Sequence, residues 1–221
     1  MLETKLRLQV IGIYLVARKW QWLIAAMVII GASVGAWGSL EASTPSAASS
    51  GGSQVPIWRL LAVGSAVLPT LTLASPLQAL EAAAGTPFYR IRNYVLGGAF
   101  AISSACMLAG AIIELGMGVG PLVARALVAW FGLALLSGRV LGWSYSWILP
   151  SAIMCVLLYW GHDRRGQDYR WWEFSAHPVS HLPSLIIAAI LFVGGLVAYM
   201  LSPWRTYSAF RLKGGVGDSV T

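Results

Sequence analysis

Six apolar stretches, each about as long as the hydrocarbon core of a bilayer is thick, take up most of this chain. They are residues 20–40, 60–80, 93–113, 115–138, 140–161 and 182–204. A helix needs about 20 apolar residues to cross roughly 30 Å of hydrocarbon. A helix also pairs its own backbone N–H and C=O groups, which have no water to bond inside a membrane. The sequence therefore predicts an all-α membrane protein with six transmembrane helices.

The composition favours a single membrane-embedded domain. Hydrophobic residues make up 57% of the chain and charged residues only 10%, whereas about a quarter of a soluble protein is charged. The polar intervals are too short to bury a core of their own, so residues 1–221 are expected to form one transmembrane domain. Cys106 and Cys155 lie within apolar stretches and are expected to act as small apolar residues, not as a disulfide framework.

The distribution of Lys and Arg predicts the orientation of the chain. If the N-terminus is cytoplasmic, most of these residues fall in inner segments, as the positive-inside rule requires. The outer segments then hold only Arg59, Arg164, Arg165 and Arg170. Both termini are therefore expected in the cytoplasm. The net charge of +7 is explained by contact with anionic lipids of the inner leaflet, and no nucleic-acid partner is expected.

Two segments of different character flank the first apolar stretch. In residues 1–19, apolar side chains recur at helical spacing and alternate with polar ones, which predicts an amphipathic helix along the inner interface. An extended cytoplasmic start is the alternative. Residues 41–59 are rich in Ser, Ala, Gly and Thr, and this composition predicts a flexible outer loop.

The cytoplasmic connection at residues 81–92 combines one acid, a Gly-Thr-Pro break, two aromatic residues and two arginines. Pro87 disfavours helical backbone at the residue before it, so we expect a helix to end there, before the third stretch. Such a segment is suited to docking on a cytosolic partner; the alternative is an ordinary basic anchor at the membrane surface. The candidate contact residues are Glu81, Pro87, Arg90 and Arg92.

The outer interval at residues 162–181 is dense in charged and aromatic side chains. Amphipathic rings suit the headgroup region, so we expect an interfacial segment inserted between the fifth and sixth helices, with its acids and arginines paired locally. Its candidate residues are Arg164, Arg165, Trp171, Trp172 and Glu173. His177 and His181 have the spacing of zinc ligands on a helix, but Pro178 and Pro183 interrupt the segment, and no metal site is predicted.

Charged groups inside apolar stretches are costly in a membrane and suggest function or pairing. Glu114 and Arg125 flank a short outer turn, and an ion pair between them is the expected arrangement.

Prolines and small residues within the stretches predict local features of the helices. Pro69, Pro76 and Pro150 are expected to kink the second and fifth helices. Gly31 and Gly35 form a GxxxG pattern, which permits close contact between helices.

Motifs for catalysis and energy coupling are absent from the sequence. There is no Walker A sequence, no GxSxG, no HExxH and no pair of acids in mid-membrane. We therefore predict no catalytic residue, no metal and no cofactor bound by this chain.

The chain resembles the permease subunits of ABC-2-type exporters, especially the small permeases of actinobacterial gene clusters. The similarity lies in the expected architecture and in three segments of local sequence: LEAAAGTPFYRIRNY after the second stretch, GRVLGWSYSWILP at the fifth, and YRWWEF before the sixth. The resemblance implies a bacterial plasma-membrane protein that pairs with an identical or related permease and with two cytosolic ATPases, which bind the ATP and magnesium.

The resemblance also implies a mechanism. The ATPases would push on the connection at residues 81–92, with Glu81, Arg90 and Arg92 as coupling residues, and the permease would export a hydrophobic or amphipathic cargo by alternating access. Two alternatives stay open. One is a non-transporting anchor that assembles a larger complex through GxxxG faces and the outer Trp-rich segment; the other is a membrane enzyme that uses the outer His, Asp and Glu residues.

Overall fold

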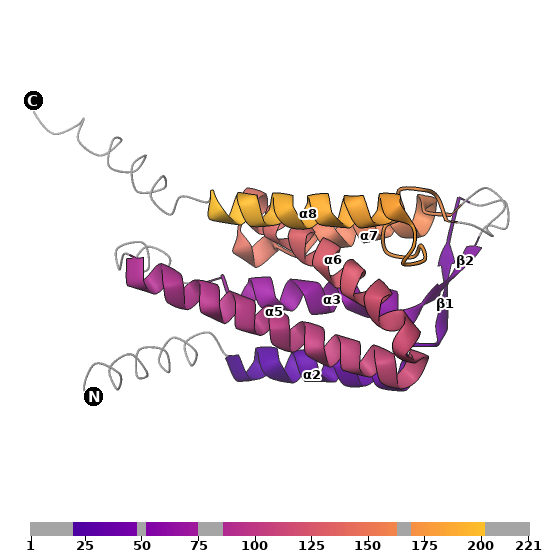
Figure 1. The fold of residues 1–221 in the computed structure, drawn as a ribbon, viewed down its shortest axis with the longest axis horizontal. Coiled ribbons are helices and arrows are strands. Elements are labelled where there is room, and N and C mark those ends of the chain that lie inside the picture. The colour runs from indigo at the N-terminus through magenta and orange to yellow at the C-terminus, as the bar shows by residue number, and fades with distance from the viewer. Residues whose placement is uncertain (1–19, 48–51, 75–85, 163–168, 202–221) are drawn as a thin grey trace, which may run out of the picture.

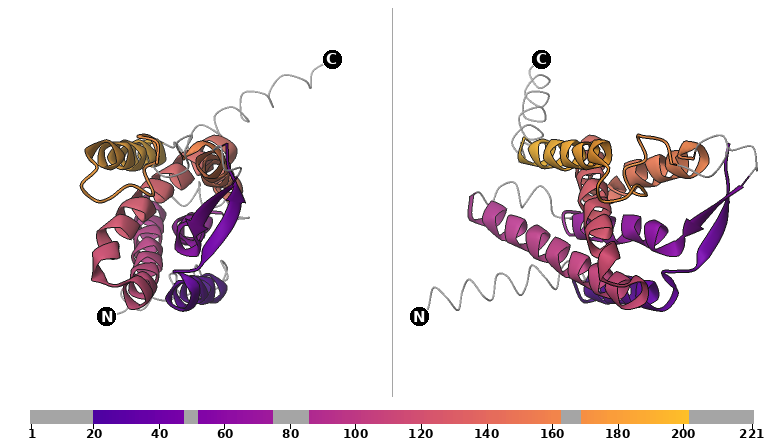
Figure 2. Two further views of the ribbon diagram at one scale, coloured as in Figure 1. Left: turned by 90° about the vertical axis from the view of Figure 1, so that its right-hand side faces the viewer. Right: turned by 45° about the vertical axis from the view of Figure 1, so that its right-hand side comes forward.

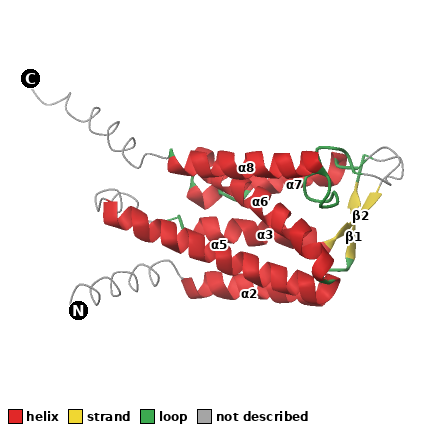
Figure 3. Cartoon of the chain, in the orientation of Figure 1, coloured by secondary structure: helices red, strands yellow, loops and turns green. Residues whose placement is uncertain are grey.

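The computed structural model describes residues 20–47, 52–74, 86–162 and 169–201. The predicted interfacial helix at residues 1–19 lies outside this part. Most of the described chain is helical, with one small hairpin of two strands (Figure 3). The elements are α2 (Trp20–Trp37), β1 (Glu41–Pro45), β2 (Gly52–Pro56), α3 (Ile57–Leu71), α5 (Thr86–Leu115), η1 (Met117–Val119), α6 (Gly120–Leu141), η2 (Trp143–Tyr145), α7 (Ile148–Trp160) and α8 (Leu182–Met200).

Successive α-helices run in opposite directions along the bundle (Figure 1). One end carries the hairpin, the start of α6 and the segment between α7 and α8; we call it the hairpin end. The start of α2, the start of α5 and the end of α8 lie at the opposite end. Helix α6 is tilted and crosses from the α2–α5 side to the α7–α8 side (Figure 2).

Four helical segments of the described chain are long and apolar enough to cross a membrane. They are Trp20–Trp37, Arg90–Leu115, Met117–Leu141 and Leu182–Met200. The helices α3 and α7 are shorter, at 15 and 13 residues, although longer helices were predicted at 60–80 and 140–161. The described chain thus has the character of a helical membrane protein with four candidate spans.

Local turns explain the two short helices. After α3, the Thr72 hydroxyl donates to the carbonyl of Pro69 (2.6 Å), and the backbone N–H groups of residues 72–74 bond carbonyls three residues back, so the helix gives way to tighter turns. The glycine Gly142 has a φ of 100°, a conformation that is costly for other residues. It ends α6 and separates it from α7, so the predicted start of a helix at residue 140 is wrong by about two turns.

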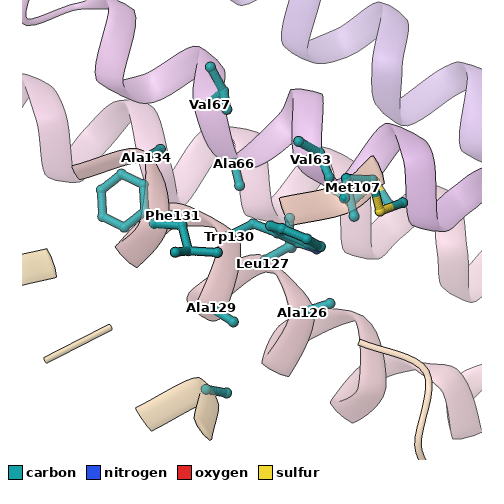
Figure 4. Packing of buried hydrophobic residues seen from close by; sticks show 14 of the residues in the cluster. Val63, Ala66, Val67, Met107, Ala126, Leu127, Ala129, Trp130, Phe131 and Ala134 are labelled. Atoms are coloured by element: carbon teal, nitrogen blue, oxygen red, sulfur yellow. The ribbon is translucent and has the colours of Figure 1, made fainter. Parts of the chain in front are cut away.

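The core is built around α6. Trp130 of α6 lies toward Ala66 of α3 and Met107 of α5, and Phe131 and Ala134 of α6 belong to the same buried cluster (Figure 4). All five side chains are at most 4% exposed. The outward faces of α2 and α8 leave large apolar side chains exposed, as expected for surfaces that contact lipid rather than water.

Glycines set the closest helix contacts. A Cβ atom added to Gly110 of α5 would lie 2.1 Å from the carbonyl oxygen of Gly31 in α2, and one at Gly195 of α8 would lie 2.3 Å from that of Gly132 in α6. Neither space admits a larger residue. The close contact predicted for Gly31 and Gly35 is confirmed, and its partner is α5 of the same chain.

The prediction of a flexible loop at residues 41–59 is wrong for its described part. Strands β1 and β2 pair antiparallel from Glu41 opposite Pro56 to Pro45 opposite Gly52. The hairpin is anchored because Val55 is fully buried and because the N–H of Ala47 donates to the carbonyl of Tyr159 at the end of α7 (2.8 Å). The amino-acid composition of the segment could not indicate these long-range contacts.

The structure shows where two of the three predicted proline kinks and both cysteines lie. Pro69 lies inside α3 near its C-terminal end. Pro150 lies in the first turn of α7, where its missing N–H has no helical acceptor, so the position does not demand the predicted kink. Pro76 lies outside the described residues. Cys106 and Cys155 are free thiols.

Candidate functional site

A buried ion pair lies at the hairpin end. Glu173 is fully buried, and its Oε2 atom lies 3.0 Å from Nη2 of Arg59, in the first turn of α3. The same Arg59 nitrogen donates to the hydroxyl of Ser175 (3.0 Å), and Ser175 donates from its N–H and hydroxyl to Glu173 Oε1. Gly161 makes room for the carboxylate, because an added Cβ would lie 2.8 Å from Glu173 Oε2.

Arg59 is the residue that sequence reasoning missed. It stands at the edge of an apolar stretch and was assigned to an outer loop. Its side chain is only 2% exposed, and its partner is 114 positions away in the segment before α8. The acids and arginines of that segment were predicted to pair locally; Glu173 instead pairs with a helix of the bundle. The pairing leaves no local sequence signal.

A second arginine holds the same segment through its backbone. Arg125 of α6 donates from Nη1 to the carbonyl of Pro178 (3.0 Å) and from Nη2 to that of His177. It is 7% exposed. The predicted ion pair between Arg125 and Glu114 is wrong, because Glu114 accepts a hydrogen bond from the hydroxyl of Ser39, at the end of α2.

Three further side chains surround the ion pair. The guanidinium of Arg59 lies over the ring of Tyr169, 5.4 Å from its centroid, and the rings of Tyr169 and His162 are 5.0 Å apart. Phe174 packs on Trp130 of the core at 4.9 Å. Burial and, to a lesser degree, the charge of Arg59 lower the pKa of His162, against an opposing effect of Glu173. His162 is therefore neutral at pH 7.

We call Arg59, Arg125, His162 and Glu173 the Glu173 cluster. Within the described residues, several of its buried polar atoms have no hydrogen-bond partner: Nε and Nη1 of Arg59, Nε of Arg125, Nδ1 of His162 and Oε2 of Glu173, which lies 3.0 Å from Nη2 of Arg59. Buried polar atoms are normally paired, and an exception calls for an explanation. Three of these atoms are guanidinium nitrogens, which can only donate, and one is a carboxylate oxygen, which can only accept, so the unpaired donors outnumber the unpaired acceptor.

The other predicted residues of the outer segment differ in their exposure to solvent and in whether the structure describes them. Trp171 is 67% exposed, and Trp172 is half-buried against the core. Arg164 and Arg165 lie outside the described residues. His177 and His181 do not share a helix. Their rings stack at 3.8 Å, His177 Nε2 contacts the carbonyl of Arg170, and His181 directly precedes α8, where its Nδ1 atom lies 2.7 Å from the hydroxyl of Ser184. The described chain has no group of three potential metal ligands.

The predicted coupling residues fall at the opposite end. Helix α5 begins at Thr86, so Pro87 lies in its first turn, where proline is favoured. The helix that was expected to end before Pro87 lies outside the described residues, but the expected start of the third helix at residue 93 is wrong by about two turns. Arg90 and Arg92 therefore belong to the helix and not to a connection. Arg90 is exposed. Glu81 lies outside the described residues.

Arg92 is buried, with 3% of its surface exposed. Its guanidinium lies 5.3 Å from the ring centroid of Trp143 in η2 and 5.5 Å from that of Tyr199 in α8. The hydroxyl of Tyr199 donates to Asn93 Oδ1 (2.6 Å). Gly138 leaves the space for Trp143, because an added Cβ would lie 2.4 Å from that ring. We call this contact of α5, η2 and α8 the Arg92 site.

No protein-family model, no curated protein and no solved structure matches this chain. The resemblance to ABC-2-type permeases therefore stays an expectation from the sequence, based on the expected six-helix architecture and the three segments quoted above.

Proposed function

We propose that this chain is the membrane-spanning permease subunit of an ATP-driven exporter of the ABC-2 type, with all six described α-helices crossing the bacterial plasma membrane. The alternating helix directions support this topology, because they bring the start of α2 and the end of α8 to one end of the bundle (Figure 1). In the proposed orientation this end faces the cytoplasm, as the positive-inside rule favours.

The two short helices are compatible with six spans. At 1.5 Å per residue, α3 and α7 are only about 22 and 20 Å long. The hairpin extends the chain beyond α3 at one end, and η2 precedes α7 at the other. Irregular backbone is tolerated at membrane depth where protein covers it. Most of α3 is buried against α5 and α6, which supports this placement.

The observation that carries the proposal is the Arg92 site. A permease of this kind receives its energy by contact, so the surface that an ATPase pushes must be joined to other helices. Arg90 is exposed at the start of α5, and Arg92, half a turn further on, contacts both η2 and α8. A force on the start of α5 is thereby transmitted to α8 and to the connection between α6 and α7.

In this proposal the chain hydrolyses no ATP itself. Two cytosolic ATPases bind the nucleotide, and a second permease, identical or related, completes the transporter. The cargo is hydrophobic or amphipathic. Assembly through the GxxxG face of α2 has less support, because Gly31 and Gly35 already contact α5. An enzyme built on Glu173 also has less support, because that carboxylate is bonded to Arg59 and Ser175.

Affinity purification of the tagged protein in mild detergent, followed by mass spectrometry and an ATPase assay, tests the proposal. We expect a stoichiometric cytosolic ATPase to be recovered with the wild type and lost with Arg90→Ala. The matched control is Arg139→Ala, which removes the same charge from an exposed position at the same end. Recovery of no ATPase with any of the three proteins would overturn the proposal.

A further inference from the structure

The Glu173 cluster carries more positive than negative charge. Two guanidinium groups contact the segment that holds its one carboxylate: Arg59 lies 3.0 Å from Glu173, and Arg125 bonds the carbonyls of His177 and Pro178, four and five residues further along. His162 adds no charge at pH 7. In the part of the chain that the structure describes, Arg125 has no carboxylate within ion-pair distance; its partners are two backbone carbonyls. A buried charge that is not balanced is costly, and in a membrane protein it marks a functional site by default.

The unpaired nitrogens of the cluster have the chemistry of an anion site. Arg59 uses Nη2 for Glu173 and Ser175, while its Nε and Nη1 atoms are buried without an acceptor, as is Nε of Arg125. Guanidinium groups present several N–H donors in a fixed plane, which matches the oxygens of phosphate and carboxylate groups. These donors come from two different helices, α3 and α6. Arg59 is 2% exposed and Arg125 is 7% exposed.

We propose that Arg59 and Arg125 form a binding site for the phosphate or carboxylate group of an amphipathic molecule, and that Glu173 occupies this site as a resident anion. An incoming anionic group takes the place of the Glu173 carboxylate on Arg59 and supplies the second negative charge that the two arginines lack among the residues that the structure describes. The claim that this site binds the cargo of an exporter rests on the proposed function. The claim that it binds an anionic group depends only on the Glu173 cluster.

The position of Glu173 couples binding to movement of the segment before α8. Residues 169–181 are held to the bundle by the Arg59–Glu173 pair, by the carbonyl bonds of Arg125 and by the packing of Phe174 on Trp130. When an anionic group displaces the carboxylate, the first of these contacts is lost. The segment then keeps its remaining contacts, among them the bond from the Arg170 N–H to the carbonyl of Gly161 and the packing of Trp172 on the core. The occupied and unoccupied states therefore differ by the ion pair that joins the segment to α3.

Calorimetric titration of the full-length protein in a neutral detergent tests the site. The probes are monododecyl phosphate and inorganic phosphate. We expect Arg59→Gln and Arg125→Gln to weaken binding of monododecyl phosphate about tenfold or more, since each removes a charge-assisted hydrogen-bond donor. We expect Glu173→Gln to strengthen it about tenfold, because the resident anion is gone. Arg139→Gln, an exposed arginine at the opposite end, serves as the control for partition into micelles.

The opposite signs of these effects separate a binding site from a structural ion pair. If Glu173→Gln binds the probe more weakly than the wild type, or if the wild type binds no more probe than Arg59→Gln, the proposal is wrong. If the arginine variants do not fold, the comparison of Glu173→Gln with the wild type decides alone. Inorganic phosphate that binds and competes shows that the anionic group suffices; binding of monododecyl phosphate alone assigns the site to amphipathic ligands.

The titration uses the isolated chain, so its failure is distinct from failure of the exporter proposal. Anion binding without a co-purified ATPase would support the site and remove its role in export. Absence of anion binding in a protein that does recruit an ATPase would reject the site and leave the exporter proposal standing.

Discussion

The two ends of the bundle bury arginine in different surroundings. At the hairpin end, Arg59 lies 3.0 Å from the carboxylate of Glu173, which is fully buried. At the opposite end, Arg92 lies against the rings of Trp143 and Tyr199. A carboxylate binds a guanidinium group strongly, and another anion can displace it. An aromatic ring carries no net charge, and its contact with a guanidinium group contributes less energy.

This difference suggests a division of roles. The hairpin end is suited to respond to a ligand, because its ion pair can be opened by a competing anion. The Arg92 site is suited to transmit force, because it joins α5 to α8 and η2 by packing. Each prediction below alters one end and leaves the other as its reference.

The largest effect is expected from removing Glu173. Glu173→Ala leaves Arg59 buried without its counter-charge, and loss of one partner of a buried ion pair typically costs about 3–5 kcal/mol. The midpoint of thermal unfolding, followed by circular dichroism in detergent, should fall markedly. Glu114→Ala is the matched control, because Glu114 bonds only a hydroxyl group among the described residues; equal losses in the two variants would contradict a special role for the buried pair.

A smaller effect is expected at the Arg92 site. Trp143→Leu keeps the site apolar but removes the aromatic face, and a cation–π contact contributes about 0.5–2 kcal/mol. The loss of stability, measured in the same unfolding experiment, should therefore be below that of Glu173→Ala. A loss as large as that of Glu173→Ala would remove the contrast between the two ends.

The sequence predicted where helices lie better than it predicted where they end. Apolar runs predicted helices at the positions of α2, α5, α6 and α8, because hydrophobic length is a local property. The Gly31 and Gly35 contact was also readable, since close packing needs small residues at fixed spacing. The lengths of α3 and α7 could not be predicted from the sequence, because the apolar runs continue past the points where the helices end. Thr72 follows the end of α3, and Gly142 ends α6 before α7 begins.

The candidate site was predicted only in part. Glu173 was singled out among the outer residues, but its partner Arg59 was assigned to a loop, and Arg125 was paired with Glu114. Each of these errors has the same physical origin. Charged residues pair with whatever the tertiary fold brings near, and here Arg59 and Arg125 bond partners more than fifty positions away in the chain.

A pH effect should distinguish the two ends. Burial and Arg59 lower the pKa of His162, so the folded protein binds fewer protons there than the unfolded chain, whose histidine has a pKa near 6.5. Stability should therefore fall as the pH is lowered through about 6.5. The drop in unfolding temperature between pH 7.5 and pH 5.5 should be smaller in His162→Gln than in the wild type, while Trp143→Leu should show the wild-type drop.

The smallest effect on stability is expected at Arg90. The side chain is exposed on the first turns of α5, and surface substitutions usually change stability by no more than about 0.5 kcal/mol. Arg90→Ala should therefore unfold at nearly the wild-type temperature. Yet in the proposed transporter it should abolish recovery of the ATPase, because it removes a contact and not a structural element. A protein that keeps both its stability and its ATPase after this change would place the coupling surface elsewhere and leave Arg92 as a packing residue alone.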